Sequence, residues 1–570
     1  MAALFTTPKR NDTTAGTHVA EPDVRRRIGL AHGSWRRVTR RIVAGAVCAL
    51  TVSSLLMPSV SLAAEWVKVG GNKYNTAASD EAGTWSWDGA DDLKLNNYNG
   101  GEIQAAGKLN VNYSGTNIVT AEWIESINVS HGTNENAELN IQGDEGGTLS
   151  VTSTEDAILS TGNINIDGAG SVNATSTGLD AINAGGDLAI KGSGNVNATG
   201  ASDGIRANGN ITIDDSGAVT ARATKDKGIG ADKNLTIKGG GTVEASSEKD
   251  AAVEAKGSLA ATNASLNVNG VEYGVYAHKG ITLDQANVTV RASKGRYGGA
   301  NALFTYQDDI VVKNGSTVDA FAEGEVSAAF STRNDRPNEK GGHIYISDSV
   351  VKAIARYVEN GDGPIPYSEN QDGETRREPQ GENIGIIAQT SEGVTPAVIS
   401  IIRSKVTAEG DTAAIFARAM SADGKTIGTI KIENAAIQTP EGGKVIDYRK
   451  LRDGIYEAGQ AIGTGDATVD SLYIKAVAKS TTIAPPEVAK PEDPKPDETK
   501  PAESKPAESK QNPKPEGSKP TKAVAASTTK AKTTGVLAAT GDTSGAAIAA
   551  AALAGTAAIA AGAVVSRKRS

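Results

Sequence analysis

The sequence predicts an all-β fold, a right-handed parallel β-helix of about ten coils with about 23 residues in each. Three observations predict this fold. An apolar pattern recurs every 22 to 24 residues, its apolar positions alternate with polar ones, and the chain is rich in Gly but poor in aromatic residues. Of 570 residues, 65 are Gly and only 4% are aromatic, which does not suit one bulky globular core. Stacked coils bury a narrow column of small aliphatic side chains instead.

The repeat is clearest between residues 158 and 288. Its first positions, which follow one another at steps of 24, 23, 24, 24 and 22 residues, are Ile158, Ile182, Ile205, Ile229, Val253 and Val275. Its second positions, six residues later, are Ile164, Leu188, Ile211, Leu235, Leu259 and Ile281. Its third positions, thirteen or fourteen residues after the first, are Val172, Val196, Val219, Val243, Leu266 and Val288. Alternation of apolar and polar residues is the period of a β-strand, so each repeat supplies three short strands joined by Gly and Asn turns. The alternative is a two-sheet β-sandwich, which does not require such constant offsets.

Residues 1–63 are predicted to be a secretory signal peptide. A basic segment is followed by an apolar run over residues 42–62, and Ser61-Leu62-Ala63 places small residues before the expected cleavage between Ala63 and Ala64. The alternative is an uncleaved anchor helix. Cys48, the one cysteine of the chain, lies in this segment, so the mature protein needs no disulfide to fold.

Residues 64–117 and 441–478 are predicted to cap the β-helix, which spans residues 118–440. A solenoid needs caps because its end coils would otherwise expose the apolar column. The first cap contains Trp85 and Trp87, which alternate with a polar residue and therefore share one face of a strand. These indoles either cover the open end of the column or form a platform for a sugar ring.

Residues 479–536 are predicted to be a disordered, Pro-rich stalk. The segment is dense in Pro, Lys and Glu, contains the tandem repeat Pro-Ala-Glu-Ser-Lys at residues 501–510, and has few large apolar residues. Such a composition cannot bury enough apolar surface to order the chain, and its prolines favour extended polyproline II segments.

The C-terminal segment, residues 537–570, combines three features in a fixed order. Leu537, Ala538, Ala539, Thr540 and Gly541 come first, an apolar run over residues 545–565 is predicted to form a transmembrane helix, and a basic tail closes the chain. This order resembles the cell-wall sorting signal of Gram-positive surface proteins, with Ala538 where the common motif has Pro. The resemblance implies that a sortase cleaves between Thr540 and Gly541 and that peptidoglycan receives Thr540. It also implies that the chain meets the membrane only before sorting. The alternative is an ordinary membrane anchor.

A second resemblance covers the predicted β-helix. The segments Trp85-Ser-Trp-Asp88, Leu93-Lys-Leu95, Asp203-Gly-Ile205 and Asn210-Ile-Thr-Ile213 resemble a family of bacterial surface β-helices. That family is described as carbohydrate-binding, and its fold is similar to that of polysaccharide lyases. The resemblance implies binding of plant-type or acidic polysaccharide, with calcium as the candidate ion.

Asp156, Asp180 and Asp203 occupy one repeat position, two residues before the first apolar position. Stacked carboxylates repel one another unless they bind protons or a cation, and hard oxygen ligands suit Ca²⁺. The sequence therefore marks these residues as a candidate calcium ladder. The alternative is that each carboxylate bonds backbone N–H groups at a turn.

Two insertions interrupt the repeat, at residues 331–340 and 356–383. The longer one contains Tyr357, Tyr367, Arg376 and Arg377, whose rings and guanidinium groups are suited to a sugar ring and a uronate carboxylate. The alternative is a loop that the scaffold merely tolerates.

The net charge of −9 argues against nucleic acid as a partner. No catalytic arrangement is recognisable, because the three His residues after residue 63 have no metal-ligand spacing. We therefore expect a secreted, monomeric protein that is covalently anchored to the cell wall and binds a polysaccharide or host glycan without catalysis. The alternatives are a surface polysaccharide lyase or glycoside hydrolase on the same fold, and a structural spacer.

Overall fold

The computed structural model describes residues 63–122, 127–130, 137–293, 298–336, 340–358, 382–422, 424–452, 455–466, 468–469 and 476–486. All of its regular elements are β-strands, and none of the described residues forms a helix that is long and apolar enough to cross a membrane. The described residues belong to one compact unit, residues 1–489. The predicted signal segment before Ala63, nearly all of the predicted stalk and the whole predicted sorting signal lie outside them.

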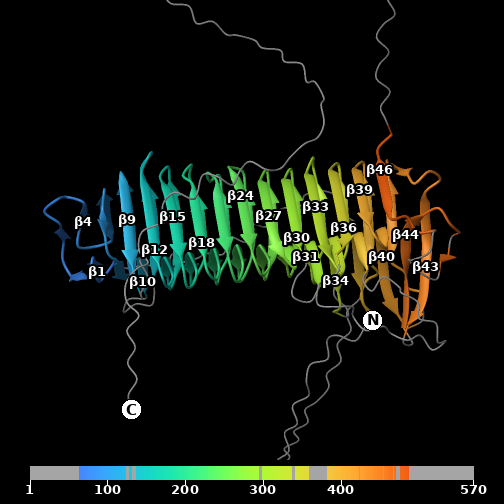
Figure 1. Cartoon of the computed structure of the whole chain (residues 1–570), viewed down its shortest axis with the longest axis horizontal. Coiled ribbons are helices and arrows are strands. Elements are labelled where there is room, and N and C mark those ends of the chain that lie inside the picture. The colour runs from blue at the N-terminus through green and yellow to red at the C-terminus, as the bar shows by residue number, and fades with distance from the viewer. Residues whose placement is uncertain are drawn as a thin grey trace, which may run out of the picture. The chain divides into compact units, whose positions relative to one another are not determined.

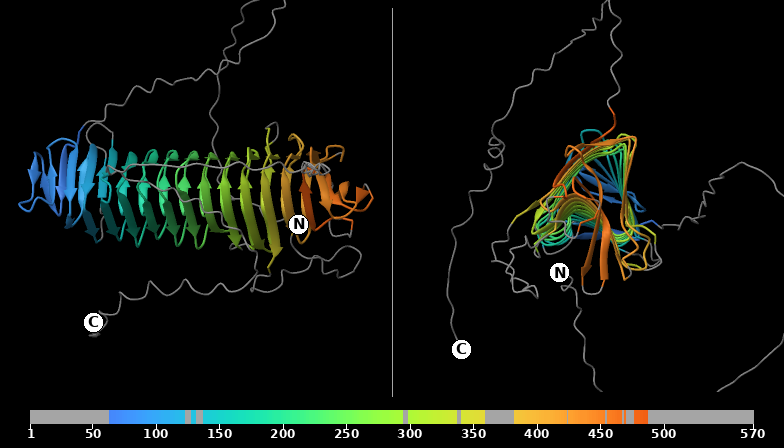
Figure 2. Two further views of the ribbon diagram at one scale, coloured as in Figure 1. Left: turned by 90° about the horizontal axis from the view of Figure 1, so that it is seen from above. Right: turned by 90° about the vertical axis from the view of Figure 1, so that its right-hand side faces the viewer.

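Three long sheets, A, B and C, surround a central column, as the view along the axis in Figure 2 shows. Sheet A contains, in spatial order, β3 (Ala78–Ser79), β4 (Trp85–Trp87), β5 (Asp92–Asn96), β8 (Lys108–Ser114), β11 (Glu138–Gly143), β14 (Asn163–Gly168), β17 (Leu188–Lys191), β20 (Ile211–Asp214), β23 (Leu235–Lys238), β26 (Ser258–Thr262), β29 (Gly280–Asp284), β32 (Ile310–Lys313), β35 (Ile344–Ser347), β38 (Val398–Ile402) and β41 (Thr429–Glu433).

Sheet B contains, in the order of its pairings, β2 (Asn72–Tyr74), β1 (Trp66–Val69), β7 (Ile103–Ala106), β10 (Ile127–Ser130), β13 (Ile158–Ser160), β16 (Ile182–Ala184), β19 (Ile205–Ala207), β22 (Ile229–Ala231), β25 (Val253–Ala255), β28 (Tyr273–Ala277), β31 (Gly299–Thr305), β34 (Val326–Asn334), β37 (Asn383–Thr390), β40 (Ala413–Ser421), β44 (Ile455–Gly463), β43 (Lys444–Arg452) and β45 (Thr468–Val469). Sheet C contains β6 (Asn99–Gly100), β9 (Thr116–Ala121), β12 (Thr148–Ser153), β15 (Ser171–Ser176), β18 (Val196–Gly200), β21 (Val219–Ala223), β24 (Thr242–Ser247), β27 (Ser265–Val271), β30 (Asn287–Ser293), β33 (Thr317–Gly324), β36 (Val350–Tyr357), β39 (Lys405–Gly410), β46 (Ser480–Ala484) and β42 (Ala436–Thr439).

The strand register confirms the predicted parallel β-helix. The first repeat positions stack in sheet B, where Ile182 pairs with Ile158 on one side and with Ile205 on the other. The second and third positions stack in the same way in sheets A and C. The chain therefore visits sheets B, A and C in turn, and Figure 1 shows the resulting rows of strands side by side.

The core is one continuous column of Ile, Leu, Val and Ala side chains that are almost completely buried. Phe330 is the bulkiest of the fully buried side chains in the column, and it lies where the strands of sheet B lengthen toward the C-terminal end. Because the column is narrow, small aliphatic residues fill it, which accounts for the low aromatic content.

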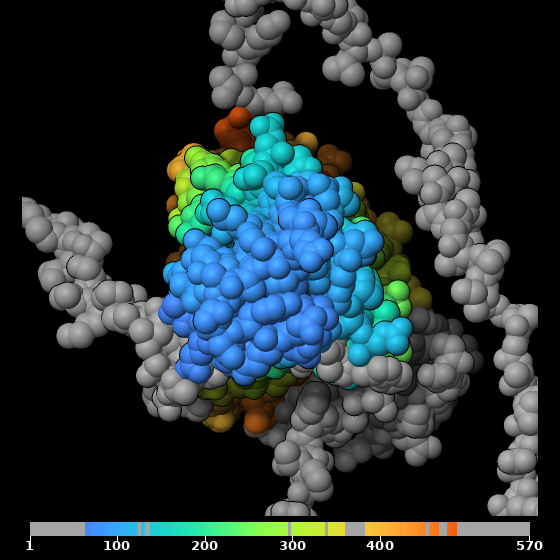
Figure 3. Space-filling model, turned by 90° about the vertical axis from the view of Figure 1, so that its left-hand side faces the viewer, coloured from blue at the N-terminus to red at the C-terminus, as the bar shows by residue number. Residues whose placement is uncertain are grey.

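The N-terminal cap is shorter than the predicted residues 64–117. Strands β3, β4 and β5 pair antiparallel, as do β1 and β2, whereas β5 already pairs parallel with β8, and β8 with β11. Trp85 and Trp87 are 7% and 2% exposed and belong to the core cluster. Figure 3 shows N-terminal residues closing this end of the column. The indoles therefore cover the column, as the first alternative expected, and they offer no open sugar platform.

The C-terminal end is closed by strands that run against the coils. Strand β44 pairs antiparallel with β40, and β43 folds back on β44 as a hairpin. Strand β46 pairs antiparallel with both β39 and β42, and its Thr481 and Ile483 are fully buried. The folded unit thus extends through Ala484, past the point where we expected the stalk to begin at residue 479. Ile483 of β46 pairs with Val406 of β39 on one side and with Ile437 of β42 on the other, so β46 is inserted between these two strands.

Candidate functional site

Asp156, Asp180 and Asp203 stack at the corner where each coil passes from sheet C to sheet B. Oδ1 of Asp156 accepts the backbone N–H of Asp180 at 2.9 Å, Oδ1 of Asp180 accepts that of Asp203 at 2.8 Å, and Oδ1 of Asp203 accepts that of Lys227 at 2.7 Å. Each carboxylate therefore satisfies a backbone donor of the next coil. This is the turn chemistry of the second alternative.

The same three carboxylates do not form a compact ion site. Among the described residues, only Asp88, Asp91 and Asp92 bring three acidic oxygens within 4.8 Å of one another. In that group Oδ1 of Asp88 accepts the N–H groups of Ala90 and Asp92, so it serves a turn of the N-terminal cap. The oxygens of Asp156, Asp180 and Asp203 do not converge in this way, because each Oδ1 accepts a backbone N–H of the next coil. The geometry therefore favours the turn alternative, and calcium binding at these residues stays a prediction.

Burial raises the pKa of Asp180 and raises that of Asp203 to about 7. Asp203 is 1% exposed, and its nearest cation is Arg206, whose Nη1 lies 3.6 Å from Oδ2. Removal of a carboxylate from water disfavours its charged form, and neither the hydrogen bond from the backbone N–H of Lys227 nor the charge of Lys227 offsets this cost. The ladder thus contains a carboxyl group that is half protonated near neutral pH.

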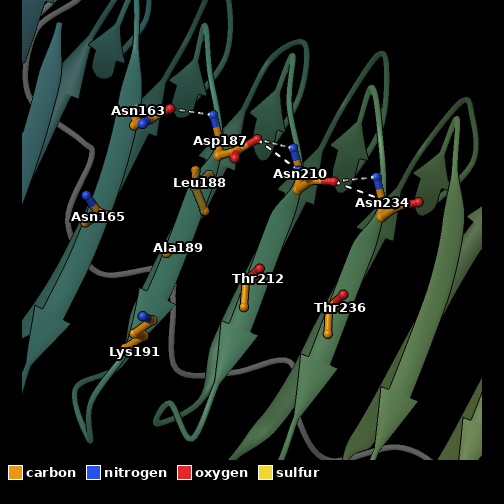
Figure 4. A pocket seen from close by; sticks show the side chains of 10 residues that line it. All are labelled: Asn163, Asn165, Asp187, Leu188, Ala189, Lys191, Asn210, Thr212, Asn234 and Thr236. Atoms are coloured by element: carbon orange, nitrogen blue, oxygen red, sulfur yellow. Dashed lines mark hydrogen bonds between the residues drawn. The ribbon is translucent and has the colours of Figure 1, made fainter. Parts of the chain in front are cut away.

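A second ladder follows the corner between sheets B and A (Figure 4). Oδ1 of Asn163 accepts the backbone N–H of Asp187 at 2.8 Å, Oδ1 of Asp187 accepts that of Asn210 at 2.7 Å, and the series continues through Asn234 to Ser258. The side chains beside this second ladder, among them Thr212 and Thr236, line a polar pocket on sheet A. Because the ladder uses its oxygens within the protein, we assign it a structural role.

Lys227 replaces Asp in the next coil of the first ladder, and its ammonium lies among three carboxylates. Nζ contacts Oδ1 of Asp226 and lies 3.2 Å from Oδ2 of Asp250 and 3.5 Å from Oε2 of Glu254. Burial alone would lower the pKa of Lys227, but the hydrogen bond to Asp226 and the charges of the neighbouring carboxylates outweigh burial and raise it. Lys227 is therefore held as a cation and cannot act as a general base.

Half-buried aromatic rings lie next to this cluster on the outer face of sheet B. Tyr276 stacks between Tyr273, at 5.0 Å between ring centroids, and His278, at 4.5 Å, and Phe304 of the next coil lies 5.3 Å from Tyr276. Nε2 of His278 lies 3.2 Å from Oε1 of Glu254. Glu254, Tyr276 and Phe304 are register partners on adjacent strands.

A continuous row of charged, polar and aromatic groups results. We call it the aromatic–ionic track, and it consists of Lys227, Glu254, Tyr273, Tyr276, His278 and Phe304. Burial raises the pKa of Tyr276 to about 12, so its hydroxyl is protonated at neutral pH and can act as a hydrogen-bond donor. The track thus combines apolar ring surface with hydrogen-bond donors and acceptors on a rigid scaffold, the usual make-up of a small-molecule or glycan contact site.

Tyr357 ends strand β36 and is 41% exposed. Its backbone N–H donates to Oδ2 of Asp411 at 2.5 Å. Tyr367, Arg376 and Arg377 lie outside the described residues, so their grouping with Tyr357 stays a prediction. The longer insertion connects β36 of sheet C to β37 of sheet B, and the shorter one connects β34 of sheet B to β35 of sheet A. Their described flanks therefore lie at opposite ends of the sheet B strands.

Arg418 fixes the point where the chain returns from the longer insertion. Its Nη1 lies 3.0 Å from Oε2 of Glu382 and 3.7 Å from Oε2 of Glu457, and its Nε donates to Oε1 of Gln389 at 3.1 Å. The side chain is only 11% exposed. Arg418 therefore connects Glu382 to the C-terminal hairpin through a buried ion pair.

Sequence reasoning did not identify the aromatic–ionic track. Its signal was nevertheless present, because Tyr276 follows the buried Val275 and must point outward, and Glu254 follows the buried Val253 in the same way. The strand that carries Phe304 was not recognised, because it departs from the 23-residue spacing.

Comparisons with protein-family models, with curated proteins and with solved structures found no match to this chain. The resemblances to sorting signals and to carbohydrate-binding β-helices therefore stay predictions.

Proposed function

We propose that this protein is a secreted, cell-wall-anchored β-helix that binds a glycan without cleaving it, with the aromatic–ionic track as its contact site. The observation that carries the proposal is the gathering of Tyr273, Tyr276 and Phe304 on an outward face of a chain that is only 4% aromatic. Packing of the core does not require these rings. Aromatic rings beside hydrogen-bonding groups suit a sugar, which presents both apolar ring faces and hydroxyls.

Anchoring is proposed from the ends of the chain. The basic and apolar N-terminal segment supports export, and the motif Leu537–Gly541 with its apolar run and basic tail supports sortase as a partner and peptidoglycan as the attachment site. The predicted stalk was expected from residue 479, and the part of it that remains after β46, the last described strand, begins at Pro485 and Pro486. Such an arrangement would display the β-helix away from its attachment point.

Binding is favoured over cleavage because Lys227, the half-buried ammonium of the track, is engaged by carboxylates. A lyase needs a basic side chain that accepts a proton from the sugar ring, and Lys227 is held in its charged form by three carboxylates.

A glycan array with the full chain tests the proposal. We expect binding that is lost in Tyr276→Ala and kept in Tyr345→Ala, since Tyr345 is a 37% exposed tyrosine on sheet A, outside the track. Equal binding by both variants would show that the aromatic–ionic track is not the glycan contact site. Release of unsaturated oligosaccharides from a bound polysaccharide would establish a lyase instead.

A further inference from the structure

The N-terminal part of sheet C has an outer face without charged side chains. We call it the hydroxyl face, and it consists of the outward positions of β9, β12, β15 and β18. One column of exposed threonines crosses all four strands, with successive members in register: Thr120, Thr152, Thr175 and Thr199. A neighbouring column contains Ile118, Ser150, Asn173 and Asn197. Hydroxyl and amide groups therefore make up almost the whole face.

The hydroxyl face is flat and regular because it follows the parallel register. Adjacent strands lie about 4.8 Å apart and alternate residues along a strand about 6.6 Å apart, so the side chains form a grid with these spacings. Nδ2 of Asn197 donates to Oδ1 of Asn173 at 2.9 Å, which aligns two amides along the column.

The first charged side chain on this side of sheet C lies on β21, directly after the hydroxyl face. Arg222 takes the position next to Thr199 in the threonine column, and its Nη2 lies 3.8 Å from Oε2 of Glu244. The other outer faces also carry charge, for example Lys191 on sheet A and Arg206 on sheet B. With 22% of the chain charged, the gap is a local property of these four strands.

The absence of charge indicates the kind of partner. A chain with net charge −9 repels a polyanion, and a face without carboxylates offers nothing to a cation. Threonine hydroxyls and asparagine amides both donate and accept hydrogen bonds, which matches a partner whose own groups do the same. A flat grid fits an extended partner that is itself flat.

We propose that the hydroxyl face binds an extended, uncharged polysaccharide. This inference rests on the proposed glycan-binding function and adds a second contact surface with a defined ligand class. Its place on the rod is consistent with display, because β9 to β18 lie toward one end of the rod, and β46, after which the chain continues, lies at the other (Figure 1).

The experiment measures depletion of the full chain from solution by microcrystalline cellulose, with soluble polygalacturonate as the charged counterpart. We expect retention on cellulose that salt does not weaken, and no binding to polygalacturonate. The double variant Thr152→Glu/Thr175→Glu should reduce retention at least tenfold, because it places two carboxylates in register on the face. The matched control is Thr212→Glu/Thr236→Glu, which makes the same change at register partners on sheet A and should leave retention unchanged.

The variant Thr152→Val/Thr175→Val removes only the hydroxyls and keeps the side-chain shape, so it should also weaken retention while the melting temperature stays the same. Equal loss in the sheet A control, or no loss in either face variant, would overturn the inference. If Tyr276→Ala abolishes cellulose binding and the face variants do not, glycan binding stands and the hydroxyl face is not part of it. If the face variants change only the sedimentation coefficient, the face joins two copies of the chain and the inference fails.

Discussion

Oδ1 of Asp203 accepts the backbone N–H of Lys227, its counterpart in the next coil, at 2.7 Å. The carboxyl group is buried, and this burial raises its pKa to about 7. The hydrogen bond from Lys227 lowers the pKa of Asp203, but burial outweighs it, so the carboxyl group that satisfies this backbone donor titrates near neutral pH.

The stability of the β-helix should depend on pH through Asp203. Its pKa in the folded state lies above the unfolded value of 3.8, so its contribution is fully present below about pH 4 and is lost as the pH rises through 7. Asp203→Asn keeps the Oδ1 acceptor and removes the charge. We expect this variant to be more stable than the wild type at pH 8 by roughly 1 to 3 kcal/mol, with no advantage at pH 4. Urea denaturation at both pH values measures the difference. The control Asp187→Asn, at an exposed rung of the second ladder, should change stability by less than about 0.5 kcal/mol at either pH.

Lys227 acts as the counter-ion of Asp226, Asp250 and Glu254. Lys227→Ala leaves three carboxylates facing one another, and we expect a loss of about 2 to 4 kcal/mol of unfolding free energy. Hard carboxylate oxygens suit calcium, so millimolar Ca²⁺ should raise the melting temperature of this variant but not that of the wild type. Scanning calorimetry with and without Ca²⁺ measures both effects. A calcium-dependent shift of equal size in the wild type would show that another ion site exists.

Arg418 connects the insertion to the C-terminal hairpin through Glu382 and Glu457. Arg418→Met should cost about 3 to 5 kcal/mol, because both carboxylates lose their buried partner. Arg418→Lys should recover little of this loss, since a lysine cannot contact Gln389 and the two carboxylates in a forked geometry. Hydrogen exchange should locate the loosening at β37, β40 and β44. Exchange that is unchanged there would contradict this role.

Trp87 covers the end of the column, and its Nε1 donates to the carbonyl of Ala90 at 3.1 Å. Trp87→Ala should cost about 3 to 5 kcal/mol, with faster hydrogen exchange in β5 and β8 than in distant strands such as β32. The conservative Trp87→Phe keeps an aromatic cover and should cost less. Uniform exchange along the whole rod in both variants would show that the cap does not protect the end coils.

The core register was predictable from sequence because every coil repeats the same requirement. Ile182 must stack on Ile158, and a shift of one residue would turn the apolar side chain outward, so the period is strongly imposed. For the first corner ladder, the positions of the residues were predictable from the sequence, but the partners of their oxygens were not. The position of Asp156, Asp180 and Asp203 was evident, but whether their oxygens bind an ion or a backbone N–H depends on distances that the spacing does not contain.

Two features could not be derived from the repeat. Outward residues such as Tyr276 and Phe304 face no periodic constraint, so their grouping follows only from the strand register. Strand β46, Ser480–Ala484, lies next to a Pro-rich segment, and among the described strands it is not part of the 23-residue repeat. Its place between β39 and β42 is a tertiary contact that local pattern does not encode.

This placement of β46 has a mechanical consequence for a tethered molecule. A pull applied through the residues after Ala484 and directed along the strand loads both flanking hydrogen-bond ladders at once. Bonds loaded in parallel share the force, whereas bonds at a free edge rupture one after another. Single-molecule stretching from the C-terminal end should therefore give a lower rupture force when Thr482 is replaced by Pro, which removes one strand donor. In the proposed tethered protein, β46 would thus also act as a shear clamp that limits the tension at which the coils begin to unravel.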